Sequence, residues 1–435
     1  MQLIPDATTD GLRARVFARL SARLDGPPDR PIAIGLSGGG DSHALLVLAC
    51  EWARATGRKV LALTVDHRLN PQSEHWTQSA GEMARALGAN WQALSWADAR
   101  AGTAVQERAR MARHALLAEA AREAGAGILL LGHTANDAAE NQWMRDDGTP
   151  VGQLRELLPS PVWPQGRGIT LLRPLLAEKR EQLRQFLRQC GLGWIDDPAN
   201  ADLRYSRIRA RQAVGAPVAN EASRVEIMTP DPGPLADVGV LTFPRETLRV
   251  GAARTVSAAL LCASGTSVPP RGDRLEALMD RIASKQDAVS VLCGARVEMD
   301  AQSVHVFREA GEQRRSGLLP LILPKGVTTV WDGRFAFTSS HEGWTVMSAG
   351  GNLSRLSRQD RQKLSVLPAA ARASLPILHN SRTEQYVLQS PEVAVSGLCG
   401  RRYRATVMCL ADETTQEDAL FDLWHGETGP TVLFS

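Results

Sequence analysis

The sequence lacks the features that mark membrane, secreted and disulfide-bonded proteins. No stretch of its 435 residues approaches ~18 uninterrupted apolar residues, so no helix is expected to span a bilayer. The first twenty residues carry Asp6 and Asp10 and no apolar segment, which argues against a signal peptide. The six cysteines form no C-x-x-C pair, which disfavours a disulfide scaffold, a zinc ribbon or a cysteine-ligated cluster and favours a reducing, cytoplasmic location.

The chain also lacks a strong net charge. It has 50 basic and 47 acidic residues, a formal charge of 50 − 47 = +3, whereas nucleic-acid-binding domains are usually clearly basic. The charge is uneven, however, because residues 173–211 hold nine basic and five acidic side chains, a local balance of 9 − 5 = +4. Residues 204–211 contain no acid, and we predict that Arg207 and Arg209 contact phosphates of ATP or RNA. Residues 179–188 are equally consistent with a solvated helix face.

Length and composition predict a globular chain of two or three domains, with 43% hydrophobic and 22% charged residues. In the first part, strand-like runs alternate with helical patterns, which predicts a Rossmann-like, doubly wound α/β fold with a parallel sheet. The prolines between residues 213 and 235 indicate a boundary between two domains. The expected domains are a catalytic domain (1–215), a mainly helical domain (216–315) and a β-rich accessory domain (316–435). The expected strands cover residues 31–36, 59–65, 90–96 and 128–131, and the expected helices 43–54, 104–123, 136–145 and 178–189.

Polar residues follow three of the predicted strands at the point where each strand ends. These residues are Ser37, Asp66 and His133. Because ligands of open parallel sheets bind outside the carboxyl ends of the strands, we expect the three segments to line one crevice. Their convergence is stronger support for a binding site than any single motif.

A glycine-rich loop, Ser37-Gly38-Gly39-Gly40-Asp41-Ser42, lies between a predicted strand and a predicted helix. Glycines allow the backbone to approach a ligand closely, and the N–H groups of the loop and of the helix N-terminus bind phosphate. Asp41 beside a phosphate makes sense when Mg²⁺ bridges the two. The loop matches neither the Walker motif nor the G-x-G-x-x-G dinucleotide motif. An ordinary glycine-rich turn with a polar cap is the structural alternative.

The loop resembles the PP-loop of ATP pyrophosphatases, and an ordered set of further motifs narrows the resemblance. Over roughly residues 30–212 the chain is similar to the tRNA(Ile)-lysidine synthetase family. The motifs include Val65-Asp66-His67-Arg68-Leu69, Gly132-His133-Thr134-Ala135-Asn136-Asp137, Arg173-Pro174-Leu175-Leu176 and Trp194-Ile195-Asp196-Asp197-Pro198.

This resemblance implies a specific reaction and specific partners. ATP adenylates the C2 carbonyl oxygen of the wobble cytidine in a tRNA(Ile) with a CAU anticodon, and the ε-amine of free L-lysine then attacks C2 and expels AMP. It implies that residues 37–42, Asp66, Arg207 and Arg209 bind ATP, with Mg²⁺ held by Asp41. The accessory regions are expected to recognise the tRNA.

The resemblance also assigns catalytic roles. Asp41, Arg113, His133, Asp137 and Glu140 are the expected catalytic residues. Asp137 and Glu140 lie three residues apart on one helix face and are suited to orienting or deprotonating lysine. Arg113 is suited to neutralising a phosphate. Each of these side chains also has a structural alternative, as a surface charge, a packed histidine or a strand cap.

Three residues depart from the family pattern, and they put a mechanism with two adjacent acids in doubt. Asn136 replaces the first member of an Asp pair, and Ala138 and Asn141 replace Gln and Thr. A PP-loop enzyme that adds sulfur to tRNA, a catalytically silent tRNA-binding protein and a small-molecule amidating or NAD-forming enzyme stay open as alternatives. The chain is expected not to bind a membrane, and a homodimer is compatible with the sequence.

Overall fold

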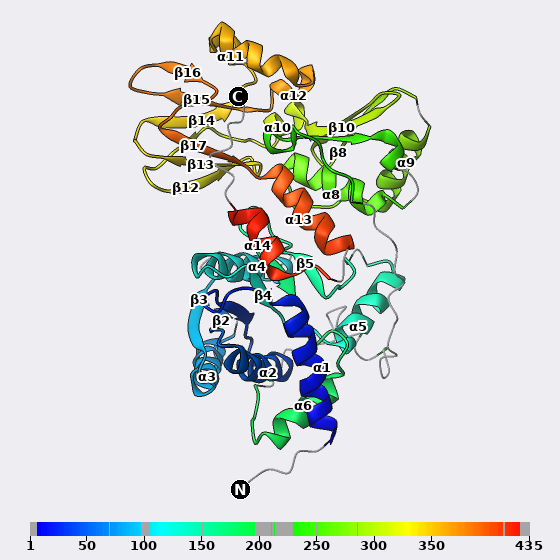
Figure 1. The fold of residues 1–435 in the computed structure, drawn as a ribbon, viewed down its shortest axis with the longest axis vertical. Coiled ribbons are helices and arrows are strands. Elements are labelled where there is room, and N and C mark those ends of the chain that lie inside the picture. The colour runs from blue at the N-terminus through cyan, green and yellow to red at the C-terminus, as the bar shows by residue number, and fades with distance from the viewer. Residues whose placement is uncertain are drawn as a thin grey trace. The chain divides into compact units, whose positions relative to one another are not determined.

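The computed structural model describes residues 7–68, 70–96, 105–149, 151–195, 210, 213, 229–248, 251–284, 286–411 and 414–426. The chain divides into two compact units. The first contains Met1–Ser223 and Glu413–Asp422, and the second contains Arg224–Asp412 and Leu423–Ser435. Figure 1 labels the elements of both units. Within the described residues, no helix has both the length and the apolar character needed to cross a membrane.

The first unit is built on a six-stranded sheet with the order β3-β2-β1-β4-β6-β5. All neighbours from β3 to β6 pair in parallel, and only β5 at the edge is antiparallel. The expected doubly wound parallel sheet is therefore confirmed, but β5 and β6 were not among the strands expected from the sequence. The strands are β1 (Ile32–Gly35), β2 (Val60–Asp66), β3 (Asn90–Ser95), β4 (Ile128–Leu130), β5 (Leu157–Pro159) and β6 (Thr170–Leu172).

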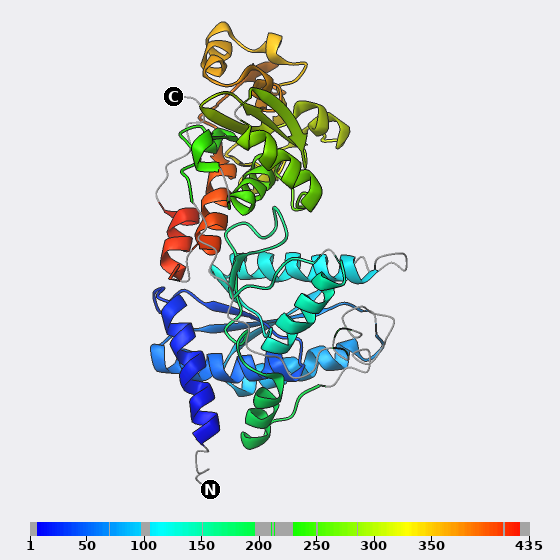
Figure 2. The same ribbon diagram turned by 90° about the vertical axis from the view of Figure 1, so that its right-hand side faces the viewer.

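Helices cover both faces of this sheet. Figure 2 shows α2 and α3 on one side and α4 on the other, as right-handed crossovers require when the strand order reverses after β3. The reversal makes the boundary between β1 and β4 the topological switch point, where ligands of such sheets bind. The helices are α1 (Ala7–Arg23), α2 (Gly40–Thr56), α3 (Ser73–Ala86), α4 (Val105–Glu123), α5 (Ala135–Asp146) and α6 (Arg180–Gln189).

A segment from near the C-terminus completes the first unit. Glu417, the first residue of α14 (Glu417–His425), is buried and accepts hydrogen bonds from both terminal nitrogens of Arg58, each at 3.0 Å. Arg23 donates to the Thr415 carbonyl at 3.0 Å. The first unit is therefore discontinuous in sequence. No local sequence pattern predicts that Arg58 pairs with Glu417.

The second unit contains three small sheets with helices around them. Region 216–315, expected to be mainly helical, holds an antiparallel sheet (β7-β10-β9-β8) together with α8 and α9. Its strands alternate buried and more exposed residues, as a sheet with one buried face requires. The elements here are β7 (Val240–Pro244), α8 (Ala253–Ser264), α9 (Gly272–Ala283), β8 (Ala288–Leu292), β9 (Ala295–Met299), β10 (Ser303–Arg308) and α10 (Ala310–Arg315).

The remaining part of the second unit is rich in strands, and its two sheets have the orders β11-β14-β15-β16 and β12-β13-β17. Phe335, Phe337, Trp344 and Ile377 are buried in its core. The strands are β11 (Leu321–Ile322), β12 (Thr328–Trp331), β13 (Phe335–Ser339), β14 (Trp344–Ser348), β15 (Pro376–Asn380), β16 (Gln385–Val387) and β17 (Val393–Gly397). The helices are α11 (Arg358–Lys363), α12 (Ala369–Arg372) and α13 (Cys399–Ala411).

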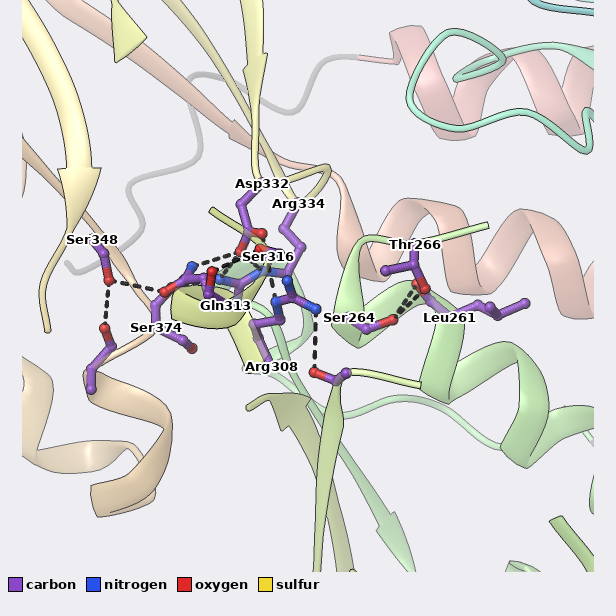
Figure 3. Close-up of polar contacts among 12 residues, drawn as sticks. Leu261, Ser264, Thr266, Arg308, Gln313, Ser316, Asp332, Arg334, Ser348 and Ser374 are labelled. Atoms are coloured by element: carbon purple, nitrogen blue, oxygen red, sulfur yellow. Dashed lines mark hydrogen bonds and ion pairs between the residues drawn. The ribbon is translucent and has the colours of Figure 1, made fainter. Parts of the chain in front are cut away.

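A buried polar network, which we call the Asp332 cluster, lies at the turn between β12 and β13 (Figure 3). Arg334 approaches the Asp332 carboxylate at 2.6 Å, and Arg308 approaches it at 3.6 Å. The side-chain amide of Gln313 donates to Asp332 at 2.7 Å and to the Ser374 carbonyl at 3.0 Å. Two arginines thus share one carboxylate inside the protein.

Candidate active site

The glycine loop joins β1 to α2 and is held by its two serines. The Ser42 hydroxyl donates to the Gly39 carbonyl at 2.9 Å and accepts from the Ser37 N–H at 3.2 Å. The two hydroxyls lie 3.0 Å apart. Gly39 is the N-cap of α2 and provides no side-chain cap, so the first N–H groups of the helix have no partner within it. Together with the helix dipole, they form a site for an anion such as phosphate.

Close packing around the loop explains why its glycines are needed. Gly38 has a φ of +81°, and a Cβ there would lie 2.6 Å from the Ile195 side chain. The Ile195 N–H donates to the Gly38 carbonyl at 2.9 Å, so this segment supports the loop. A Cβ on Gly132 would lie 3.0 Å from the backbone nitrogen of Ser42, so the end of β4 also packs directly against the loop.

Three of the expected catalytic acids meet around one arginine, and we call this group the Arg180 cluster. Arg180 donates from Nε to Asp41 at 2.9 Å, and its terminal nitrogens lie 3.4 Å from Asp137 and 3.4 Å from Glu140. The side chains of Arg180 and Asp41 are 15% and 21% exposed, so the cluster is accessible at one side. With all acids ionised, its formal charge is −3 + 1 = −2.

Burial and neighbouring charges act in opposite directions on Asp41. Burial raises the pKa of Asp41, Arg180 and Arg184 offset part of this effect, and Asp137 adds to it. Burial alone would lower the pKa of Arg180, but Asp137 and Asp41 raise it overall, so Arg180 stays charged. A second cation at this position would stabilise the ionised acids.

Asp137 and Asn136 also have structural roles at the start of α5. The N–H and hydroxyl of Thr134 both donate to Asp137 Oδ2, at 2.9 and 2.8 Å, which forms an N-terminal cap. Asn136 Oδ1 accepts from the Arg180 N–H at 2.9 Å and so links α5 to α6. An asparagine oxygen is sufficient for this link, which gives a physical reason why Asn is tolerated where the family pattern has Asp.

The opposite side of the site is basic. His133 follows β4, and its Nδ1 lies 3.2 Å from Arg173 Nε. Arg113 on α4 lowers the pKa values of His67 and His114, although burial is the larger cause in both. For His114 the pKa falls to about 3. The expected residues His133 and Arg113 thus belong to a group of basic side chains around His114.

The structure does not test the three remaining expected nucleotide contacts, Asp66, Arg207 and Arg209. Asp66 Oδ1 accepts from the Arg68 N–H at 2.8 Å and shapes the turn after β2, where Arg68 has a φ of +52°. Its role in binding ATP stays a prediction. Arg207 and Arg209 lie outside the described residues.

Arg180 is the functional residue that the sequence analysis missed, because residues 179–188 were interpreted as a solvated face or a phosphate track. One signal was available. Arg180 is the first residue of α6, where a positive charge is unfavourable because of the helix dipole. A cation in this position indicates a specific anionic partner.

The residues present fit a magnesium ion that is shared with a substrate. Among the described residues, no group of three or more His, Cys, Asp or Glu side chains is arranged to hold a metal. Mg²⁺ in nucleotide sites typically uses one or two carboxylates and completes its shell with phosphates and water. Asp41, in the first turn of α2 beside the glycine loop, is such a carboxylate.

A strand, a glycine loop and a helix at the switch point of a parallel sheet, with acids at the rim, define a PP-loop ATP-binding domain. The sequence profile of the PP-loop domain matches residues 13–217. The chain is 47% identical to a tRNA(Ile)-lysidine synthase of Caulobacter vibrioides, over 84% of this chain and 88% of the relative. It is 34% identical to the tRNA(Ile)-lysidine synthase of Hyphomonas neptunium, over 68% and 85% of the two chains. The chain belongs to the tRNA(Ile)-lysidine synthase family.

Among solved structures, the chain is similar to the U34-tRNA thiolase NcsA from Methanococcus maripaludis. The identity is 16%, the alignment covers 47% of this chain and 71% of that chain, and the TM-score is 0.40. A likeness of this size carries no argument about activity.

Proposed function

We propose that this protein ligates free lysine to C2 of the wobble cytidine in the CAU anticodon of tRNA(Ile). The reaction uses ATP, proceeds through an adenylated cytidine and releases AMP and pyrophosphate. The observation that carries the proposal is the Arg180 cluster, in which three carboxylates gather beside a phosphate-binding loop with a formal excess of two negative charges. An enzyme that joins an ammonium compound to a phosphate-activated carbonyl needs both features in one site.

Hydrogen-bond donors and carboxylates have different roles in this reaction. Backbone N–H groups at the start of α2 and the Ser37 and Ser42 hydroxyls bind the phosphates of ATP. Mg²⁺, when bound at Asp41, supplies charge neutralisation for the departing pyrophosphate. Glu140 and Asp137 attract the ε-ammonium of lysine, and a carboxylate accepts its proton before the amine attacks. Arg180 holds the three acids together and offsets part of the effect by which burial raises the pKa of Asp41.

Sulfur transfer, the main alternative, finds little support in the cysteines. Thiolate chemistry requires a cysteine with an ordinary or lowered pKa. Burial raises the pKa of Cys50 and Cys262 to about 11 and also raises that of Cys190. None of these thiols is among the residues that form the Arg180 cluster.

The direct test is an incubation of the protein with ATP, Mg²⁺, labelled lysine and unmodified tRNA(Ile) with a CAU anticodon. We expect label to enter the tRNA and AMP to be released in equal amount. A matched tRNA whose wobble cytidine is replaced by uridine should accept no label. Absence of lysine from the correct tRNA, with the protein folded, would contradict the proposal.

A further inference from the structure

The parallel register between β4 and β6 brings His133 and Arg173 together. Leu130 pairs with Leu172, and the Leu131 N–H donates to the Leu172 carbonyl at 3.0 Å. The next residues along each strand therefore leave the sheet side by side. Arg173 Nε then reaches His133 Nδ1 at 3.2 Å.

Arg173 is itself firmly held. Its guanidinium donates to the Arg155 carbonyl at 2.8 Å, its backbone N–H donates to the Glu156 carbonyl at 2.8 Å, and only 5% of the residue is exposed. Burial lowers its pKa to about 10, so it stays positively charged at neutral pH. A guanidinium can only donate hydrogen bonds, so the His133 Nδ1 atom must offer its lone pair.

This contact determines the hydrogen position on the imidazole of His133. With Nδ1 acting as acceptor, the ring is neutral and carries its hydrogen on Nε2, which can then only donate. The neighbouring His114 on α4 lies in cationic surroundings. Burial is the main cause that lowers its pKa, and Arg113, Arg110, His133 and Arg173 lower it further.

We propose that Arg173 is a positioning residue that fixes His133 as a neutral Nε2–H hydrogen-bond donor for the lysine-transfer reaction. This inference depends on the proposed function. In that reaction negative charge is carried by the phosphate oxygens and by the adenylated carbonyl oxygen as AMP leaves. A neutral donor stabilises such an oxygen without releasing a proton to it. His133 therefore acts as a hydrogen-bond donor to this oxygen. The carboxylates of the Arg180 cluster accept the proton of the lysine ε-ammonium.

The first test reads the tautomer directly by NMR with ¹⁵N-labelled histidine. His133 is identified among the nine histidines as the signal that disappears in His133→Asn. We expect its Nδ1 to be unprotonated and its Nε2 protonated from pH 6 to pH 8. A wild-type His133 that carries hydrogen on Nδ1, or that titrates with an ordinary histidine pKa, would overturn the proposal.

The second test uses variants of Arg173. Arg173→Met should let His133 populate both tautomers and raise its pKa, and should lower kcat about tenfold with little change in the KM for lysine. Arg173→Lys should restore part of kcat and most of the Nε2–H signal, because an ammonium also only donates. Arg167→Met, which alters a half-buried arginine bonded to the Pro164 carbonyl, is the matched control and should leave His133 unchanged.

The outcomes separate the two proposals. Unchanged His133 signals in folded Arg173→Met would overturn the positioning role. Absence of lysine transfer in the wild type would instead contradict the proposed function, while the NMR measurement would still decide the state of His133.

Discussion

The two units each contain a cluster of charged side chains, and the clusters are built in opposite ways. In the first unit one arginine, Arg180, serves three carboxylates. In the second unit one carboxylate, Asp332, serves the two arginines Arg308 and Arg334. Arg334 is 1% exposed, whereas Arg180 and Asp41 keep 15% and 21% of their side-chain surface.

The two clusters differ in how far their charges are matched by other groups of the protein. A cluster whose charges are matched within the protein mainly stabilises the fold, whereas a cluster with excess charge can bind a ligand. In the Asp332 cluster Arg334 also donates to the Ser374 carbonyl, and Arg308 donates to the Gly294 carbonyl at 3.4 Å, so most of the polar groups are matched by other groups of the protein (Figure 3). Arg308 Nε is buried 3.6 Å from the Asp332 carboxylate and has no hydrogen-bond partner among the described residues. In the Arg180 cluster three carboxylates lie beside the glycine loop, and their formal charge exceeds that of Arg180, although Arg184 also acts on Asp41. Mutations should therefore affect mainly stability in one cluster and mainly chemistry in the other.

The largest effect is expected for Asp332→Asn. Removing this charge leaves two buried guanidinium groups without a carboxylate, so the free energy of unfolding of the second unit should fall by about 3–5 kcal/mol. Urea unfolding followed by circular dichroism measures this loss. The exposed acid Glu384 offers a control in the same unit, and Glu384→Gln should cost less than about 0.5 kcal/mol. A loss below about 1 kcal/mol for Asp332→Asn would show that the cluster is not structural.

A buried ion pair in the first unit tests whether internal charge matching, rather than the unit in which a charge lies, makes that charge important for stability. Arg58 and Glu417 are 2% and 0% exposed at their side chains. Arg58→Met should destabilise the first unit by about 3 kcal/mol, because it leaves the Glu417 carboxylate buried with less compensation. The double variant Arg58→Met/Glu417→Leu should recover most of this loss in urea unfolding. A double variant no more stable than the single one would argue against the buried-charge explanation.

Replacement of Arg180 should separate chemistry from stability. Arg180→Met should lower kcat/KM for lysine transfer about 100-fold, or ~2.7 kcal/mol, because the three acids lose the cation that holds them together. The unfolding free energy should fall by only about 1 kcal/mol, because water reaches the side chains of Arg180 and Asp41, which are 15% and 21% exposed. Arg188→Met on the same helix, which alters an exposed ion pair with Glu181, is the control and should retain activity. If Arg180→Met and Arg188→Met were equally active, Arg180 would have no role in the reaction.

At neutral pH the smallest effect is expected at the buried imidazole of His114, whose contribution appears only on acidification. Because burial lowers its pKa from 6.5 to about 3, only the unfolded chain binds a proton there between these values. Stability from this residue is therefore complete above pH 6.5 and is lost as pH falls toward 3, by at most ~1.4 kcal/mol per pH unit. His114→Phe should show a shallower acid dependence of the unfolding free energy, whereas replacement of the exposed His75 should not. Parallel curves for wild type and His114→Phe would contradict this account.

Local patterns were sufficient for most of the catalytic unit. Apolar runs ended at polar residues, and the strands β1, β2, β3 and β4 lie within one residue of the expected limits. The glycine loop was identified from its motif, and the φ of +81° at Gly38 explains why glycine is favoured there. By contrast, the short edge strand β5 has three residues among prolines, too few for a periodic signal.

Residues close together in the chain were enough to predict the class of fold, and they also suggested the glycine loop and the acids as candidate site residues. Which charges meet became visible only in the folded chain. Arg180 lies 139 residues from Asp41, and Glu417 lies 359 residues from Arg58. Such pairs form because burial in a low-dielectric interior makes an unpartnered charge costly, and the fold, not the spacing along the chain, brings the compensating charge within reach.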